Sequence, residues 1–347
     1  ASNWQGTQHE FQRYYQYSEL MYELAPDSLD AIMELSYATN SLGSLAIKQQ
    51  QFAIARENFE ESLRLKLLAQ AKQPENTQLL ADIADTRSWL ASATLAEGNL
   101  LSAITIHKAL QNDLVLAEVK EPYLLDILSS SYQILADFLS YQGDFETARA
   151  FYLEGYRTLA KALEQDPDNS RWQRRKYLLD INALNFSIND DITAIEQHVS
   201  SLKHILTSGP TQLSDSQRKE LLSRLWLTTG VKLHQINQIA LSENYTDLAV
   251  SGYSELSENF PLNRAHYIAL LESQLLQAKT RSVLHGQDKA VVICRNIKDR
   301  LADIIENNKE PRYLINYAKA LDCLNEISEH SVLISLLQHN AITNFHF

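Results

Sequence analysis

The ten histidines of the chain could bind a metal ion or transfer protons, but their spacing favours neither role. His198 and His204 are six residues apart, which places them on different faces of a helix. His339 and His346 lie in a C-terminal stretch with no cysteine or acid close by. Protein metal sites need several ligands brought together, so we predict no metal site and no cofactor.

The other candidates for catalysis are equally sparse. Asp190 and Asp191 form an acidic pair, but they lie in a predicted turn, where aspartate commonly caps the following helix. No nucleophile lies beside a base in a known motif, and no glycine-rich loop could hold a phosphate. We therefore predict that the chain is not an enzyme.

A stripe of polar side chains does recur, at spacing i, i+3 and i+7 in three predicted helices. This spacing places each trio on one helical face, separate from the face that carries small residues. None of the nine is Lys or Arg, so their chemistry is hydrogen bonding and not the clamping of a carboxylate. The members of this polar stripe are Tyr37, Asn40 and Ser44; Asp85, Ser88 and Ser92; and Ser130, Gln133 and Asp137.

The elements that position this stripe follow from the prolines, which recur at intervals of 43 to 51 residues. Proline is excluded from helix interiors and tolerated in first turns, so regular spacing indicates one helical unit copied along the chain. Repeats of this length are typical of solenoids. The seven prolines are Pro26, Pro74, Pro122, Pro167, Pro210, Pro261 and Pro311.

Each of the first three units contains an internal turn 24 residues before its closing proline, at Gln50, Gly98 and Gly143. Columns of like residues lie at fixed distances from this turn, so each unit is a helical hairpin with close-packed helices. The small-residue columns are Gly43, Ala91 and Ala136, and Ala55, Ala103 and Ala148; the column at plus nine is Phe59, His107 and Tyr152.

The units resemble the tetratricopeptide repeat (TPR), because a small residue, a turn, an alanine, an aromatic residue and Pro-x-Asn follow one another in this order. The units here are longer, because each second helix runs on by about two turns. The junction at 166–174, Asp-Pro-Asp-Asn-Ser-Arg-Trp-Gln-Arg, is similar to those of arrays appended to bacterial membrane-anchored serine/threonine kinases and winged-helix regulators.

The resemblance implies an all-α, right-handed α-solenoid of antiparallel helix pairs, about six or seven pairs after an N-terminal helix. It also implies that first helices line a concave groove. The polar stripe would then contact a bound protein or peptide, with Tyr37, Trp89 and Tyr141 as apolar anchors. We divide this one continuous solenoid into a capping helix (1–25), three well-formed units (26–169), divergent units (170–310) and C-terminal capping helices with a tail (311–347).

The predicted helices alternate with the turns. In the divergent part we place a turn at 189–191 and a second helix that resumes at 244. The well-formed pairs are predicted at 28–49 and 52–72, 76–97 and 100–120, and 123–142 and 145–165.

The charge balance excludes one class of partner. With 43 acidic against 31 basic residues, the formal charge is −12, which disfavours nucleic acid. The densest basic stretch, 171–176, could pair with a phosphate or an acidic peptide; we interpret it as a solvated helix face.

No stretch is apolar for long enough to insert into a membrane. We interpret Cys294 and Cys323 as separate buried side chains, which do not show whether the compartment is oxidising or reducing. Because the first residue is Ala1 and not Met, we expect a piece of a longer protein. By family analogy this piece would be the extracytoplasmic (periplasmic) sensory or interaction segment of a bacterial signalling protein.

Three alternatives remain at this stage. The first is a free-standing cytoplasmic adaptor or assembly scaffold. The second is an enzyme with an unfamiliar active site between the fourth and fifth units, in the region of 189–210. The third is self-association through the polar-aromatic tail or an exposed end of the solenoid.

Overall fold

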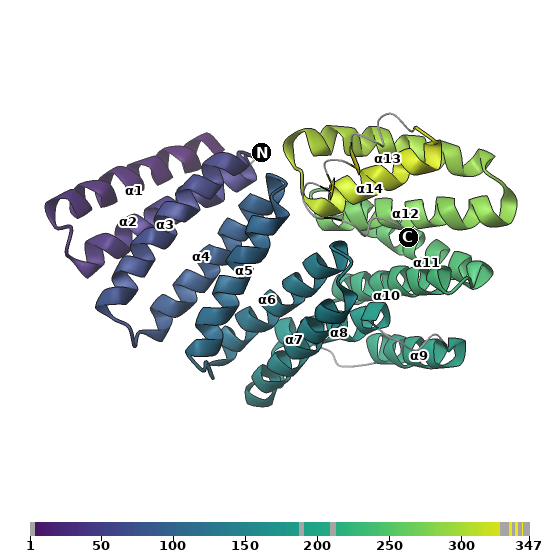
Figure 1. The fold of residues 1–347 in the computed structure, drawn as a ribbon, viewed down its shortest axis with the longest axis horizontal. Coiled ribbons are helices and arrows are strands. Elements are labelled where there is room, and N and C mark those ends of the chain that lie inside the picture. The colour runs from purple at the N-terminus through teal and green to yellow at the C-terminus, as the bar shows by residue number, and fades with distance from the viewer. Residues whose placement is uncertain are drawn as a thin grey trace.

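The structure of the chain is a computed structural model that describes residues 4–186, 191–208, 213–326, 333–334, 337–338 and 342. These residues form fourteen α-helices and one short 3-10 helix, with no strand among them (Figure 1). The fold class predicted from the sequence, an all-α solenoid of helix pairs, is confirmed.

The elements, in chain order, are α1 (Trp4–Leu24), α2 (Leu29–Lys48), α3 (Phe52–Lys72), α4 (Thr77–Ala96), α5 (Leu100–Leu116), α6 (Pro122–Tyr141), α7 (Phe145–Gln165), α8 (Ser170–Asn182), η1 (Ala183–Phe186), α9 (Ile192–Ser208), α10 (Asp215–Gln235), α11 (Ile239–Asn259), α12 (Arg264–His285), α13 (Asp288–Asn307) and α14 (Pro311–Leu324). Helices adjacent in sequence pack side by side along the array, and even-numbered helices are the first helices of their pairs.

In the five helix pairs whose turn the structure describes, one residue in the left-handed region makes this turn. Its φ is 60° at Gln50, 88° at Gly98, 81° at Gly143, 62° at Asn237 and 93° at Gly286. The turn positions aligned in the sequence are therefore confirmed. The turn expected at 189–191 falls mostly outside the described residues.

Two predicted helix boundaries are wrong. The second helix of the fifth pair, α11, begins at Ile239 and not at 244, because Asn237 makes the tight turn that glycine makes elsewhere. Helix α5 ends at Leu116 and not at 120, since Glu118 turns left-handed with φ 48°.

The junctions between units act through helix capping. The Asn76 side chain accepts the backbone N–H groups of Gln78 and Leu79 at the start of α4, and Asn169 and Asn263 cap α8 and α12 in the same way. Pro122 and Pro311, in contrast, occupy the first turns of α6 and α14. Recurrent prolines and asparagines thus mark where α4, α6, α8, α12 and α14 begin, whereas Ser28 and Ser214 cap α2 and α10.

Within a pair, small residues allow the two helices to approach closely. A Cβ atom added to Gly43 would lie 2.8 Å from Cε1 of Phe59, whose ring is fully buried. The equivalent residues in the next units are also buried: Ala91 and Ala136 on the first helices, His107 and Tyr152 on the second.

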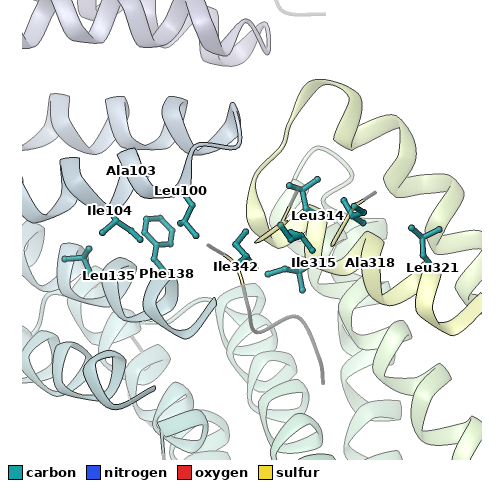
Figure 2. Packing of buried hydrophobic residues seen from close by; sticks show 12 residues of the cluster. Leu100, Ala103, Ile104, Leu135, Phe138, Leu314, Ile315, Ala318, Leu321 and Ile342 are labelled. Atoms are coloured by element: carbon teal, nitrogen blue, oxygen red, sulfur yellow. The ribbon is translucent and has the colours of Figure 1, made fainter. Parts of the chain in front are cut away.

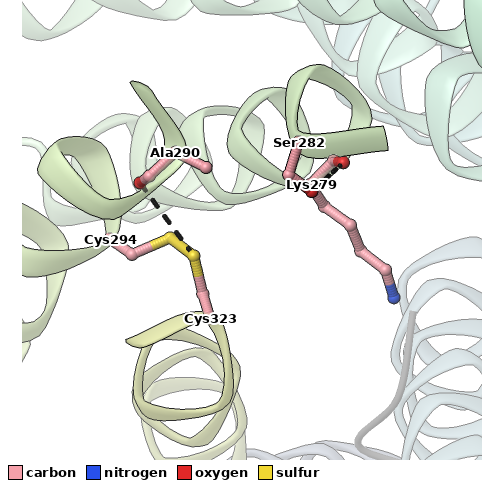
Figure 3. Close-up of a disulfide and its surroundings, with 5 residues drawn as sticks. All are labelled: Lys279, Ser282, Ala290, Cys294 and Cys323. Atoms are coloured by element: carbon pink, nitrogen blue, oxygen red, sulfur yellow. Dashed lines mark hydrogen bonds between the residues drawn. A yellow bond between two sulfur atoms is a disulfide. The ribbon is translucent and has the colours of Figure 1, made fainter. Parts of the chain in front are cut away.

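The interpretation of the cysteines as separate side chains is wrong. Cys294 of α13 and Cys323 of α14 form a disulfide, with Cα atoms 6.2 Å apart (Figure 3). The two cysteines are 29 positions apart in the sequence, on either side of the loop between these helices, so the bond links the second helix of one pair, α13, to the first helix of the next, α14. Spacing in a sequence does not reveal this juxtaposition, because it depends on how α13 and α14 pack.

The array also turns back on itself. One buried apolar cluster contains Leu100 of α5, Phe138 of α6 and Leu314 and Ile315 of α14 (Figure 2). Ile342, which is fully buried, lies between the two sides. Nearby, the backbone N–H of Lys309 donates to the carbonyl of Ala96 at 2.8 Å. The C-terminal helices therefore close the inner side of the solenoid opposite α5 and α6.

Replacing Gln50 with glycine should stabilise the protein. A side chain in the left-handed region costs about 1–2 kcal/mol, and the extra chain entropy of glycine offsets part of the gain. We expect Gln50→Gly to raise the free energy of unfolding by about 0.5–1 kcal/mol in urea titrations. The neighbouring Gln49→Gly, at φ −85°, is the matched control and should lower it; equal effects of the two substitutions would contradict the argument.

Candidate binding surface and pocket

The first helices line the inner surface of the array. Helix α4 contacts α2 and α6, and α12 contacts α10 and α14, in addition to the second helices of their own pairs. All nine side chains of the polar stripe lie on α2, α4 and α6, and each is exposed or half-buried. The stripe is therefore accessible, but its members lie in two different environments.

The first environment is the inner surface of α2 and α4. The Tyr37 hydroxyl donates to Oδ2 of Asp82 at 2.7 Å, which joins the two helices. Lys66, on α3, is buried beneath them: its Nζ donates to Thr86 Oγ1 at 2.6 Å and lies 5.4 Å from the Tyr37 ring centroid. Burial lowers the pKa of Lys66, although Asp82 and Asp85 oppose this shift.

Other members of the stripe bond within or between their helices. The hydroxyls of Ser88 and Ser92 each donate to a backbone carbonyl one turn earlier in α4. The Gln133 amide donates to Ser129 Oγ at 3.1 Å, and Asn40 accepts from Thr86. A serine hydroxyl that already donates its hydrogen in this way can only accept a hydrogen bond from a partner.

The second environment is a pocket of about 550 Å³ lined by residues of α4, α5, α6, α7, η1, α10, α12 and α14. Two stripe residues, Ser92 and Asp137, line it, and so does Tyr141. The remaining seven stripe residues do not line the pocket. The structure thus divides a stripe that appears uniform in the sequence.

An ion pair crosses the pocket wall between α12 and α14. The guanidinium of Arg312 donates to both oxygens of Glu272 at 2.6 Å, and the Asn316 amide donates to Glu272 Oε1 at 3.1 Å. Burial alone would raise the pKa of Glu272, but Arg312 and these hydrogen bonds lower it to about 2. The pair is bidentate, the strong geometry for arginine and carboxylate.

Further charged groups converge on the same space. The carboxyl of Asp137 is open to the pocket interior but surrounded by protein, and this desolvation raises its pKa to about 6 against the opposing effect of Arg224 and Arg312. Burial lowers the pKa of Lys319 to about 8 and raises that of Glu310. Perturbed ionisable groups gathered in a pocket are typical of functional sites.

The basic stretch 171–176 does not form a free phosphate site. Arg175 pairs with the buried carboxylate of Asp126 on α6 at 2.5 Å, and Arg174 pairs with Glu220 on α10 at 2.7 Å. Lys176 pairs with Asp180 in its own helix. These contacts fasten α8 to its neighbours, so the interpretation as a solvated helix face is wrong for Arg174 and Arg175.

Sequence reasoning missed Arg224, Glu272 and Arg312, which lie on the successive first helices α10, α12 and α14. The only available signal was a charged residue on each first helix of the divergent units. Because the repeat pattern is weak in those units, this signal could not be distinguished from ordinary surface charge.

The described part of the chain lacks two further kinds of feature. No helix there is long and apolar enough to cross a bilayer. No group of three or more His, Cys, Asp or Glu side chains among those residues is placed to hold a metal ion.

Comparison with known proteins gives structural relatives only. No protein-family model matches the chain, and no curated protein matches it significantly. BtubC (BKLC) from P. vanneervenii has a similar fold, with a TM-score of 0.53 at 15% identity over 74% of this chain and 93% of that chain.

Two further solved structures resemble the chain more weakly. A tetratricopeptide repeat protein from Parabacteroides merdae gives a TM-score of 0.38 at 14% identity, over 89% of this chain and 98% of that chain. The TPR2AB domain of yeast Sti1, in its pHSP90 complex, gives 0.28 at 12% identity, over 82% and 98%. The paired helices and left-handed turns of this chain define a TPR-like α-solenoid, as the sequence predicts.

Asp137 should make stability fall as pH rises from about 4 to about 6. The pKa of Asp137 is about 6 in the folded state and about 3.9 in the unfolded state. Unfolding therefore releases a proton between these pH values, and a rise in pH favours the unfolded state. We expect Asp137→Asn to gain stability relative to the wild type between pH 4.5 and 7.0 in urea titrations. The free energy of unfolding of Glu57→Gln, at an exposed site on α3, should change with pH as that of the wild type does. The same pH dependence in Asp137→Asn would contradict the assignment.

Proposed function

We propose that the chain is a non-catalytic scaffold that binds a protein or peptide along the inner surface of α2 and α4. The observation that carries this proposal is the accessible part of the polar stripe on these two helices. Tyr37 and Trp89 are 38% and 40% exposed there, and aromatic side chains with polar neighbours are common anchors in interfaces.

The charge of this surface favours a basic partner. Glu34, Asp82 and Asp85 present carboxylates on α2 and α4, whereas the nearby cation, Lys66, is buried. The whole chain carries a formal charge of −12, which adds long-range attraction for a basic segment. We therefore propose a partner segment with Lys or Arg residues that meet Asp82 and Asp85, and apolar residues that meet Tyr37 and Trp89.

We further propose that this scaffold is the extracytoplasmic interaction segment of a larger bacterial signalling protein. The Cys294–Cys323 disulfide supports this location, because disulfides persist in oxidising compartments and are rare in the cytosol. The resemblance of the junction at 166–174 to kinase-appended arrays supports the parent architecture. A free cytoplasmic adaptor is the alternative, and it would keep both cysteines reduced.

Charge reversal on the inner surface tests the binding proposal. A partner captured from the native source should bind Asp85→Lys at least tenfold more weakly than the wild type in titration calorimetry, because a cation replaces a carboxylate in the interface. Glu57→Lys, on α3, makes the same change in net charge at an exposed site and should bind as the wild type does. Equal loss for both variants would show that only net charge matters and would contradict the proposed surface.

The location is tested on the native protein. Cells are opened in the presence of a thiol-alkylating reagent, and the mass added to the segment is measured before and after reduction. We expect Cys294 and Cys323 to be labelled only after reduction, and external protease to cleave the membrane-associated parent in intact spheroplasts. Labelling without reduction, together with a soluble protected protein, would support the cytoplasmic adaptor instead.

A further inference from the structure

The pocket needs an explanation of its own. It lies where the C-terminal helices close the array, and a ligand inside it would contact α6, α10, α12 and α14 and not the surface of α2. Its volume of about 550 Å³ is in the range of pockets that enclose small organic ligands. It is too small for a helix of a partner protein, so binding on α2 and α4 does not account for it.

Two of its charged groups make no direct polar contact with another described residue. Glu272 and Arg312 satisfy each other across the wall. Asp137 of α6 and Arg224 of α10, in contrast, form no hydrogen bond and no ion pair within 4.0 Å among the described residues. They are close enough for Arg224 to favour the charged form of Asp137. A carboxylate and a guanidinium thus face one pocket, where both are accessible to a ligand.

The rest of the lining mixes polar and apolar side chains, and the apolar ones come from several elements. Ile134 and Phe138 come from α6, Leu227 from α10, Ile315 from α14 and Phe186 from η1. These apolar side chains can contact an apolar group of a ligand, while the charged residues of the same lining can bind its polar groups. Asp137 and Arg224 therefore lie in a pocket that offers both apolar contacts and charges of opposite sign.

We propose that this pocket binds a small zwitterion with an apolar side chain, either an α-amino acid or a dipeptide. The ligand carboxylate accepts two N–H bonds from the Arg224 guanidinium, and its ammonium group donates to the Asp137 carboxylate. The apolar side chain contacts Phe138, Leu227 and their neighbours. This inference is independent of the partner surface on α2 and α4.

Such a ligand would also join two parts of the array. Asp137 lies in the third helix pair, whereas Arg224 lies in the divergent half. A ligand that binds both charges stabilises the closed arrangement relative to any opened one, by the free energy of its binding to the closed state. Small-molecule binding would thereby be coupled to the shape of the whole solenoid.

The test uses the full chain and a defined panel: the twenty standard L-amino acids and L-leucyl-L-leucine. We expect at least one apolar member to raise the melting temperature and to give a saturable calorimetric titration, and lysine and aspartate to give neither. For the member that binds best, the amide form lacks the carboxylate and the N-acetyl form lacks the ammonium group. Each should bind at least tenfold more weakly, since each leaves one protein charge unpaired.

Substitutions test the same contacts from the protein side. Arg224→Gln and Asp137→Asn should each weaken binding at least tenfold, whereas Arg157→Gln, at an exposed site on α7, should leave it unchanged. If no member of the panel binds at millimolar concentration, or if the amide and N-acetyl forms bind as well as the parent compound, the proposal is wrong. The analogue comparison uses wild-type protein, so it decides the matter even if a variant fails to fold. Partner capture by the α2–α4 surface is measured separately and can succeed or fail on its own.

Discussion

The closure of the array is the constraint on which the rest of the structure depends. Apolar side chains of α5 and α6 that would face water in an open solenoid, such as Leu100 and Phe138, are buried against Ile315 and Ile342 instead. Burial of apolar surface contributes about 25 cal/mol per Å², so a cluster of this kind offsets the entropy lost when distant parts of the chain meet. The backbone bond from Lys309 to Ala96 fixes how the two sides meet.

Closure divides the inner surface into two regions with different physical properties. On α2 and α4 the surface stays open, polar and acidic, which suits a protein segment. Between α6 and the helices α10, α12 and α14 it becomes an enclosed pocket where charges interact through protein as well as water. The same family of first helices thereby presents one surface to large partners and another to small ligands.

Both halves of the array combine close helix packing at small residues with ion pairs between helices. Gly230 lies against Thr246 in the divergent units, and Arg87 pairs with Asp113 in the first ones. Small residues such as Gly43 recur in the first units and allow close helix packing. In the divergent units, ion pairs join neighbouring helices: Arg175 with Asp126, Arg174 with Glu220, and Arg312 with Glu272. The disulfide between α13 and α14 adds a covalent link beside the helix that carries Arg312, so it also supports one wall of the pocket.

The sequence alone determined the local structure and the architecture of the array. Proline, asparagine and glycine positions predict where helices begin and turn, because capping and left-handed φ values are properties of a few adjacent residues. The same reasoning placed the polar stripe on accessible faces of α2, α4 and α6. Only the tertiary structure decided that Asp137 lies in a pocket with Arg224, that Cys294 meets Cys323, and that Arg175 meets Asp126. Each of these contacts joins residues on different helices, and their meeting depends on the summed rotation of successive helix pairs, which no short stretch of sequence encodes.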